Sequence, residues 1–162
     1  MNKSCFDPIE DVIQAFSSGE IVVMVDDEGR ENEGDLICAA ELVTPDIINF
    51  MITHARGLVC VPMTEDRLRK LGLSRMTPAY SSDKYHTAFM DSVDVRENTT
   101  TGISAFDRAE TIKALISEKS SAQDFIKPGH VFPLKSVNNG VVERPGHTEG
   151  TVDLAKICKL KP

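Results

Sequence analysis

The chain has 162 residues, of which 41% are hydrophobic, and a formal charge of −7 from 18 basic and 25 acidic side chains. This length and apolar content fit a single domain with a buried core, so we expect residues 1–162 to form one domain. An acidic chain without a basic stripe is a poor ligand for nucleic acid, and no apolar run is long enough to span a bilayer. We therefore expect neither nucleic acid nor membrane as a partner.

Helix and strand signals alternate from the start of the chain. Asp7 is a candidate cap for a first helix, with Pro8 in the first turn and apolar residues at helical spacing up to Gly19. Apolar, β-branched runs then predict strands at 21–25 and 36–40.

The middle of the chain continues the alternation. The signals predict, in chain order, a helix opened by Thr44 and Pro45 that ends near Gly57, a strand at 58–62, a charged helix at 65–71 and a strand at 88–95. Ser104 and Asp107 then form a capping-box pattern before a helix that runs through Ile116.

The last third carries a turn signal. Asn138-Asn139-Gly140 lies between the apolar runs 131–134 and 141–142, which predicts a hairpin. A final helix of about ten residues is expected to begin near Thr151. Together the elements predict an α+β fold, in which helices pack on a mixed sheet.

The four cysteines are scattered along the chain with no close pair. This spacing suggests neither a zinc site nor a disulfide framework. A reducing compartment fits such cysteines best, so we expect a cytoplasmic protein.

The most informative segment is 26–35, which packs six carboxylates and Arg30 between two apolar runs. Neighbouring carboxylates repel unless a cation or hydrogen-bond donors compensate them, and Mg²⁺ is often held by one or two carboxylates together with substrate oxygens. A solvated acidic turn explains the composition about as well. Gly29 and Gly34 favour a binding loop, because glycine lets the backbone approach a ligand closely.

A second segment is suited to an anion. In Arg144-Pro145-Gly146-His147-Thr148, the arginine, the threonine hydroxyl and free backbone amides could surround a phosphate near a helix amino terminus. His147 is also a candidate metal ligand, together with a carboxylate from segment 26–35. A lone histidine in a loop is more often structural, so this alternative stays open.

Two further residues have both a functional and a structural interpretation. His130 stands at a strand start between a glycine turn and an apolar run, where partial burial could tune it for proton transfer. Cys60 lies on a predicted buried strand, where a small apolar core residue is the simpler interpretation.

In combination, five segments resemble the 3,4-dihydroxy-2-butanone 4-phosphate synthase family, and the resemblance runs from about Cys5 to the last residue. The segments are 26–35, 56–62, 100–104, 128–134 and 146–149. The resemblance implies the fold of that family and a homodimer that uses Mg²⁺, or Mn²⁺ in its place. It also implies the conversion of D-ribulose 5-phosphate to 3,4-dihydroxy-2-butanone 4-phosphate and formate in riboflavin biosynthesis.

The same resemblance assigns roles to residues. It implies that Glu31 and His147 bind the metal. The substrate-binding set that it implies is Arg30, Glu31, Asp35, Arg144, Pro145, Gly146, His147 and Thr148, and the catalytic set is His130, Glu31, Asp35 and Cys60.

Members of that family usually continue beyond the last helix through a strand that carries a catalytic glutamate, so by this comparison the chain is C-terminally short. Two functions follow from the sequence. The first is an active synthase. The second is a catalytically silent relative that binds metal and sugar phosphate as a binding or regulatory subunit. A magnesium-dependent enzyme acting on another phosphorylated ketose is a further alternative.

Overall fold

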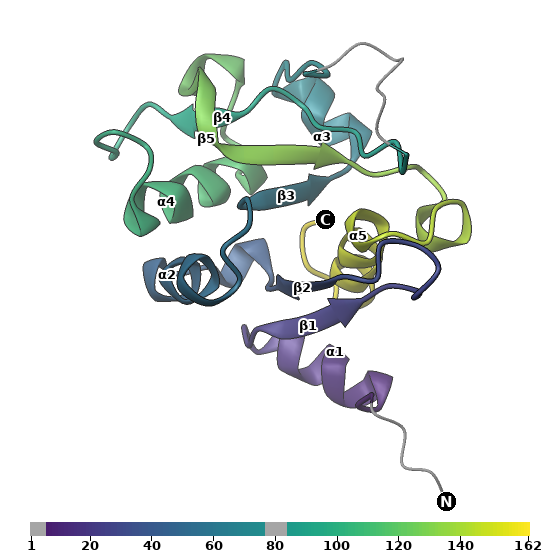
Figure 1. Cartoon of the computed structure of the whole chain (residues 1–162). Helices are drawn as coiled ribbons and strands as arrows, with labels where there is room; N and C mark the ends of the chain where they lie inside the picture. Colours follow the sequence, from purple (N-terminus) through teal and green to yellow (C-terminus); the bar gives the residue numbers. More distant parts are fainter. Residues whose placement is uncertain (1–5, 77–83) are drawn as a thin grey trace, which may run out of the picture.

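The computed structural model describes residues 6–76 and 84–162. Cys5, where the family resemblance begins, lies outside the described residues. The elements are α1 (Ile9–Ser17), β1 (Val22–Val25), β2 (Gly34–Ile37), η1 (Ala40–Leu42), α2 (Pro45–His54), β3 (Cys60–Met63), α3 (Glu65–Lys70), β4 (Val93–Val95), α4 (Ala105–Ile116), η2 (Ala122–Asp124), β5 (Phe125–Lys135), η3 (Gly140–Val142) and α5 (His147–Ile157) (Figure 1). None of the helices described is long and apolar enough to cross a membrane.

The strands form two sheets. β1 and β2 are an antiparallel pair, in which Val22 faces Ile37 and Val25 faces Gly34. β5 is the central strand of the second sheet, parallel to β3 on one side and antiparallel to β4 on the other. This mixed sheet with helices beside it confirms the predicted α+β fold.

Two apolar clusters hold the elements together. The larger cluster joins the second sheet to α2, α3 and α4, and its fully buried side chains include Ile48, Met63 and Leu115. The smaller cluster joins α1, β2 and α5 through Phe16 and Leu154, among others. Because α5 also contacts β3, this helix connects the two sheets. Its amino terminus is thereby fixed next to the loop between β1 and β2.

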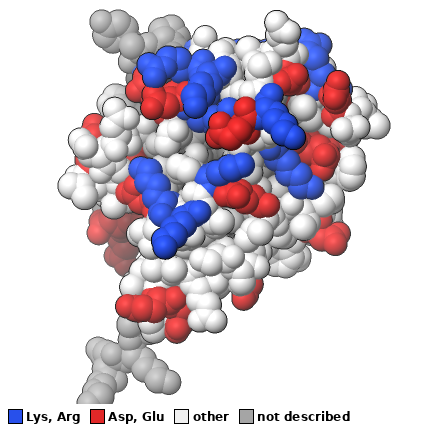
Figure 2. All heavy atoms as spheres, turned by 180° about the vertical axis from the view of Figure 1, so that it is seen from behind, with Lys and Arg blue, Asp and Glu red and all other residues white. Residues whose placement is uncertain are grey.

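Surface charge outside that loop is balanced. Residues 26–35 contribute 1 − 6 = −5 of the net −7, which leaves −2 for the rest of the chain. Accordingly, Lys and Arg side chains are interspersed with Asp and Glu on the face shown in Figure 2. The acidity is therefore concentrated at the β1–β2 loop.

The helices α2 and α4 begin where their capping signals predict. Thr44 Oγ1 accepts a hydrogen bond from the Ile47 amide, and Ser104 Oγ accepts one from the Asp107 amide. At α1 the predicted cap is wrong. Pro8 occupies the N-cap position without a side-chain hydrogen bond, because the helix begins one residue later than an Asp7 cap would require.

Several strand bounds differ from the predictions. The second strand begins at Gly34 rather than at 36, and 40 already belongs to a 3₁₀ turn. The strand after α2 is shifted to Cys60–Met63. Within 88–95 only Val93–Val95 is a strand, while Phe89 and Met90 form isolated bridges.

The largest differences lie near the carboxyl end. β5 spans Phe125–Lys135 and not only 131–134. Pro128 and Gly129 interrupt the sequence pattern of a strand there, but the amides of Gly129 and His130 donate to the side chains of Ser92 and Asp94. The hairpin predicted at 138–140 is wrong, because the second apolar run forms the turn η3 and no strand. α5 begins at His147 rather than near Thr151, and its internal Gly150 masks the helical pattern.

Candidate functional site

Asp26 organises the acidic loop between β1 and β2. Its Oδ2 accepts hydrogen bonds from Arg30 Nη1 at 2.8 Å and from the Glu31 amide at 3.0 Å, and its Oδ1 accepts one from the Glu33 amide at 3.0 Å. Burial disfavours the charged form, but these donors outweigh it and hold the pKa of Asp26 well below its usual range. The sequence pattern did not single out Asp26 as the structural centre of this loop.

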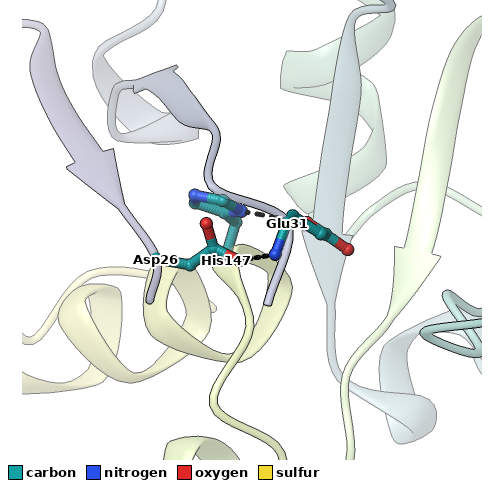
Figure 3. Close-up of side chains that lie close together, drawn as sticks. All are labelled: Asp26, Glu31 and His147. Carbon is teal, nitrogen blue, oxygen red and sulfur yellow. Dashed lines mark hydrogen bonds and ion pairs between the residues drawn. The ribbon is translucent and has the colours of Figure 1, made fainter. Parts of the chain in front are cut away.

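His147 in the first turn of α5 faces this loop (Figure 3). Its Nδ1 lies 3.5 Å from Glu31 Oε2 and 3.7 Å from Asp35 Oδ2. The ring is buried, and its Nε2 has no hydrogen-bond partner among the described residues. One ligand atom from each of Asp26, Glu31 and His147 lies within 4.8 Å of the others.

This donor set fits a divalent cation. Carboxylate oxygens suit Mg²⁺ and Mn²⁺, and a neutral imidazole nitrogen is a common ligand of divalent ions. Nδ1 is the ring nitrogen that faces the loop carboxylates, so a cation between the ring and the loop would be bound through Nδ1. The structure thus brings together Glu31 and His147, the predicted ligand pair.

Arg144 makes a buried ion pair next to this cluster. Its Nη1 donates to Glu149 Oε2 at 2.6 Å, and the Glu149 side chain is only 1% exposed. Its Nε and Nη2 donate to the Tyr85 carbonyl at 3.2 and 3.0 Å, and Nη2 also donates to Thr87 Oγ1 at 3.1 Å. Arg144 therefore ties α5 to the segment before β4, and its contact with a phosphate stays a prediction.

Gly146 lies where two guanidinium groups approach each other. A Cβ at this position would lie 2.5 Å from Arg144 Nη1 and 2.8 Å from Arg30 Nη2. Arg30 also stacks on the Tyr85 ring, with Cζ 5.1 Å from the ring centroid, and the Tyr85 hydroxyl donates to the Arg30 carbonyl. Arg30 is ion-paired with Asp26 and Glu31, and Arg144 with Glu149, so at the amino terminus of α5 the two guanidinium groups offer N–H donors suited to a phosphate rather than an uncompensated positive charge.

A cavity of about 580 Å³ joins these parts. It is lined by seven residues predicted for the site, namely Arg30, Glu31, Asp35, Cys60, Arg144, His147 and Thr148. Tyr85 and Thr87 also line it, although no sequence signal marks them. Pro145 and Gly146 are not among the described lining residues.

His130 is not among those lining residues either. It lies on β5, where its Nδ1 is 2.7 Å from Asp94 Oδ2 on β4. The structure therefore does not place His130 at the same cavity wall as Glu31 and His147.

Cys60 lines the cavity from β3. Burial raises the pKa of its thiol to about 12, and the negative charge of Asp35 adds to this shift. The thiol is therefore protonated at neutral pH, and a thiolate nucleophile is disfavoured there. A catalytic role for Cys60 stays a prediction, and it would have to use the neutral thiol.

Comparisons with known proteins agree on one family. The family model for 3,4-dihydroxy-2-butanone 4-phosphate synthase matches residues 10–162. The chain is 51% identical to the riboflavin biosynthesis protein RibBA of Bacillus mycoides (strain KBAB4) over 157 residues. This alignment covers 97% of this chain and 39% of that protein. Identity to RibBA of Bacillus subtilis (strain 168) is 50% over 153 residues, 94% of this chain and 38% of that protein. The chain thus spans less than half the length of these curated relatives.

Solved structures give the same result. A crystal structure of 3,4-dihydroxy-2-butanone 4-phosphate synthase in complex with two magnesium ions is similar with a TM-score of 0.93 and 47% identity, covering 97% of this chain and 73% of that one. RibBX from A. baumannii, a two-domain 3,4-dihydroxy-2-butanone 4-phosphate synthase, is similar with a TM-score of 0.91 and 42% identity, covering 96% of this chain and 46% of that one.

We expect Arg144→Met to lower the free energy of unfolding by about 3–5 kcal/mol, because it leaves the buried Glu149 carboxylate without its partner. The double variant Arg144→Met/Glu149→Leu should recover most of this loss, since no buried charge then remains. Urea denaturation of both proteins measures the difference. Equal stability of the single and double variants would contradict the importance of this ion pair.

We also expect Cys60 to react slowly with iodoacetamide between pH 7 and 9, because the thiolate forms only near its pKa of about 12. In denatured protein the same thiol has its ordinary pKa of about 8.5 and should react readily. Mass spectrometry of the Cys60 peptide after timed alkylation measures both rates. Equal rates in the native and denatured protein would show that the thiol is not protected.

Proposed function

Because the chain belongs to the 3,4-dihydroxy-2-butanone 4-phosphate synthase family, we propose that it converts D-ribulose 5-phosphate to 3,4-dihydroxy-2-butanone 4-phosphate and formate for riboflavin biosynthesis. The observation that carries the proposal is the cavity that joins the Glu31–His147 pair to the guanidinium groups of Arg30 and Arg144. A sugar phosphate can use both parts of this cavity. Its hydroxyl and carbonyl oxygens suit a cation at the Glu31–His147 pair, and its phosphate suits the two arginines.

Glu31 and His147 would hold the divalent cation, either Mg²⁺ or Mn²⁺. Support comes from the short distance between His147 Nδ1 and Glu31 Oε2, 3.5 Å, and from the magnesium complex of a similar synthase. When bound, the cation would polarise a ketose carbonyl and the adjacent hydroxyl, so that the neighbouring C–H becomes acidic.

Other residues of the chain would bind the phosphate and transfer protons. Arg30, Arg144 and Thr148, together with the backbone at Pro145 and Gly146, would bind the phosphate, because they surround the positive amino terminus of α5. Asp35 is the candidate proton acceptor of the loop. Its side chain lines the cavity and is 52% exposed, whereas that of Asp26 is 4% exposed and accepts hydrogen bonds with both oxygens, so Asp35 is the better placed of these two to approach substrate.

The proposal includes a homodimer in which His130 of each copy completes the cavity of the other. His130 is not among the described residues that line its own cavity, although the family resemblance makes it catalytic. Gly102 packs against Asp94, the partner of His130, and the adjacent Ile103 is 51% exposed. Phe106 and Ile126 are likewise exposed, at 53% and 43%, and exposed apolar side chains near one site favour a protein contact.

The same proposal treats residues 1–162 as one synthase domain that works in the cytoplasm. Cys38, Cys60 and Cys158 are all free thiols. Free cysteines are what a reducing compartment maintains, which supports this location.

The purified protein should release formate from D-ribulose 5-phosphate when Mg²⁺ is present, and a chelator should stop the release.

Glu31→Ala and His147→Ala should each weaken Mg²⁺ binding in calorimetry by about 100-fold or more, since losing even an outer-shell partner costs 10–100-fold. Glu28→Gln is the matched control, because it removes one charge from the same loop at an exposed position outside the cavity. Unchanged Mg²⁺ affinity in both alanine variants would exclude this metal site. A folded protein that binds the sugar phosphate but releases no formate would instead support a silent binding or regulatory subunit.

If the two copies share their sites, mixing two inactive variants should restore activity. His130→Ala and His147→Ala, unfolded together and refolded, should recover about a quarter of wild-type formate release, because half the dimers are mixed and each of these has one intact site. The matched control mixes His147→Ala with Glu31→Ala, which damage the same cavity and should not complement. No recovery in the first mixture would rule out shared sites.

A further inference from the structure

β4 and β5 separate locally at His130. Val93 pairs with Val131 and Asp94 pairs with Ile126, so residues 127–130 fall between these positions and leave the ladder. Side chains of the β4 segment replace the missing ladder bonds. Ser92 Oγ accepts from the Gly129 amide at 3.2 Å, and Asp94 Oδ1 accepts from the His130 amide at 2.9 Å. A bulge of this kind re-aims a side chain, and here it directs the His130 ring to Asp94.

Asp94 contacts His130 with both carboxylate oxygens. While Oδ1 accepts from the backbone amide, Oδ2 lies 2.7 Å from the ring Nδ1. Since an ionised carboxylate only accepts hydrogen bonds, the proton of this contact belongs to Nδ1. Asp94 has a 9% exposed side chain and His130 a 41% exposed one. No described residue forms a hydrogen bond with Nε2 of His130, so that nitrogen is open to a reactant.

The surroundings of Asp94 are fixed in turn by the hydroxyl-rich segment before α4. A Cβ at Gly102 would lie 2.1 Å from Asp94 Oδ2, and the backbone φ there is +89°, so this position requires glycine. Asp107 Oδ2 holds the turn, accepting from Thr100 Oγ1 at 2.8 Å and from the Gly102 amide at 2.9 Å. Burial lowers the pKa of Arg108, and the negative charge of Asp94 counteracts that shift, so a cation faces the carboxylate from α4.

We propose that Asp94 is a positioning residue for His130, which it holds in one ring orientation and in the tautomer protonated at Nδ1. This inference rests on the proposed function, in which His130 is catalytic, and it assigns a proton transfer to the His130 ring. Nε2 then carries the lone pair, accepts a proton from a substrate C–H or O–H group, and returns it from the resulting imidazolium to the product or to water. The Asp94 carboxylate stabilises the imidazolium while it exists. The threonine–glycine segment acts through Asp94 and needs no contact with substrate.

The test is Asp94→Asn. The amide keeps the size of the side chain and can still accept the backbone hydrogen bond, but its NH₂ group would donate to Nδ1 and favour the tautomer protonated at Nε2. We expect kcat for formate release to fall about 10–100-fold with little change in KM. Nitrogen-15 NMR of labelled histidine, at a pH where the ring is neutral, should show His130 protonated at Nδ1 in the wild type and at Nε2 in the variant. Asp94→Glu, which restores a carboxylate, should recover part of kcat.

Asp91→Asn is the matched control. Asp91 lies on the same approach to β4, but its carboxylate pairs with Lys127 at 3.1 Å and not with His130. It should change neither kcat nor the His130 spectrum. A wild-type ring protonated at Nε2 would overturn the proposal, and so would a folded Asp94→Asn with unchanged kcat. If the wild type released no formate, the proposed function would fail, while the wild-type spectrum would still decide whether Asp94 sets the tautomer.

Discussion

The buried carboxylate of Glu149 is the constraint on which the site depends. At 1% exposure it requires a compensating partner, and Arg144 supplies one at 2.6 Å. The guanidinium held in this way has a fixed orientation, because its Nε and Nη2 donate to the Tyr85 carbonyl and Nη2 also donates to Thr87. The Arg30 guanidinium stacks on the Tyr85 ring, and the Tyr85 hydroxyl donates a hydrogen bond to the Arg30 carbonyl. One desolvated charge thus connects α5, the segment before β4 and the acidic loop.

The acidic loop is organised by hydrogen bonds to Asp26. Six carboxylates in ten residues repel one another, yet Asp26 is held by one guanidinium and two backbone amides, which leaves Glu31 and Asp35 directed at His147. The cavity therefore carries the loop carboxylates Glu31 and Asp35 beside the guanidinium groups of Arg30 and Arg144, each of which is ion-paired within the protein. Both sets of side chains are fixed by contacts within the protein. A ligand that carries oxygens for a cation at one end and a phosphate at the other meets charges that need little rearrangement.

The sequence predicted those parts whose signals are local. Thr44 and Ser104 mark helix starts because a cap lies within three residues of the amide it satisfies. The loop 26–35 was singled out in the same way, from its dense carboxylates, whereas the pair of Glu31 and His147 was implied by the family resemblance and stays a prediction as a metal site. The start of α5 was missed because Gly150 weakens the helical pattern, and the part of β5 before 131–134 was missed because Pro128 and Gly129 interrupt the strand pattern.

The residues that the sequence missed share one property, which is that their partners are remote. Asp94 meets His130 across 36 positions, and Arg144 meets Tyr85 across 59. These contacts exist only once two strands or a helix and a loop have packed, so no local pattern encodes them. The two groups of site residues also lie on different elements, with the proposed metal pair on the β1–β2 loop and α5 and the His130–Asp94 pair on β5 and β4. If a second copy must bring these groups together, association becomes part of building the site, and activity per chain falls when dilution dissociates the copies.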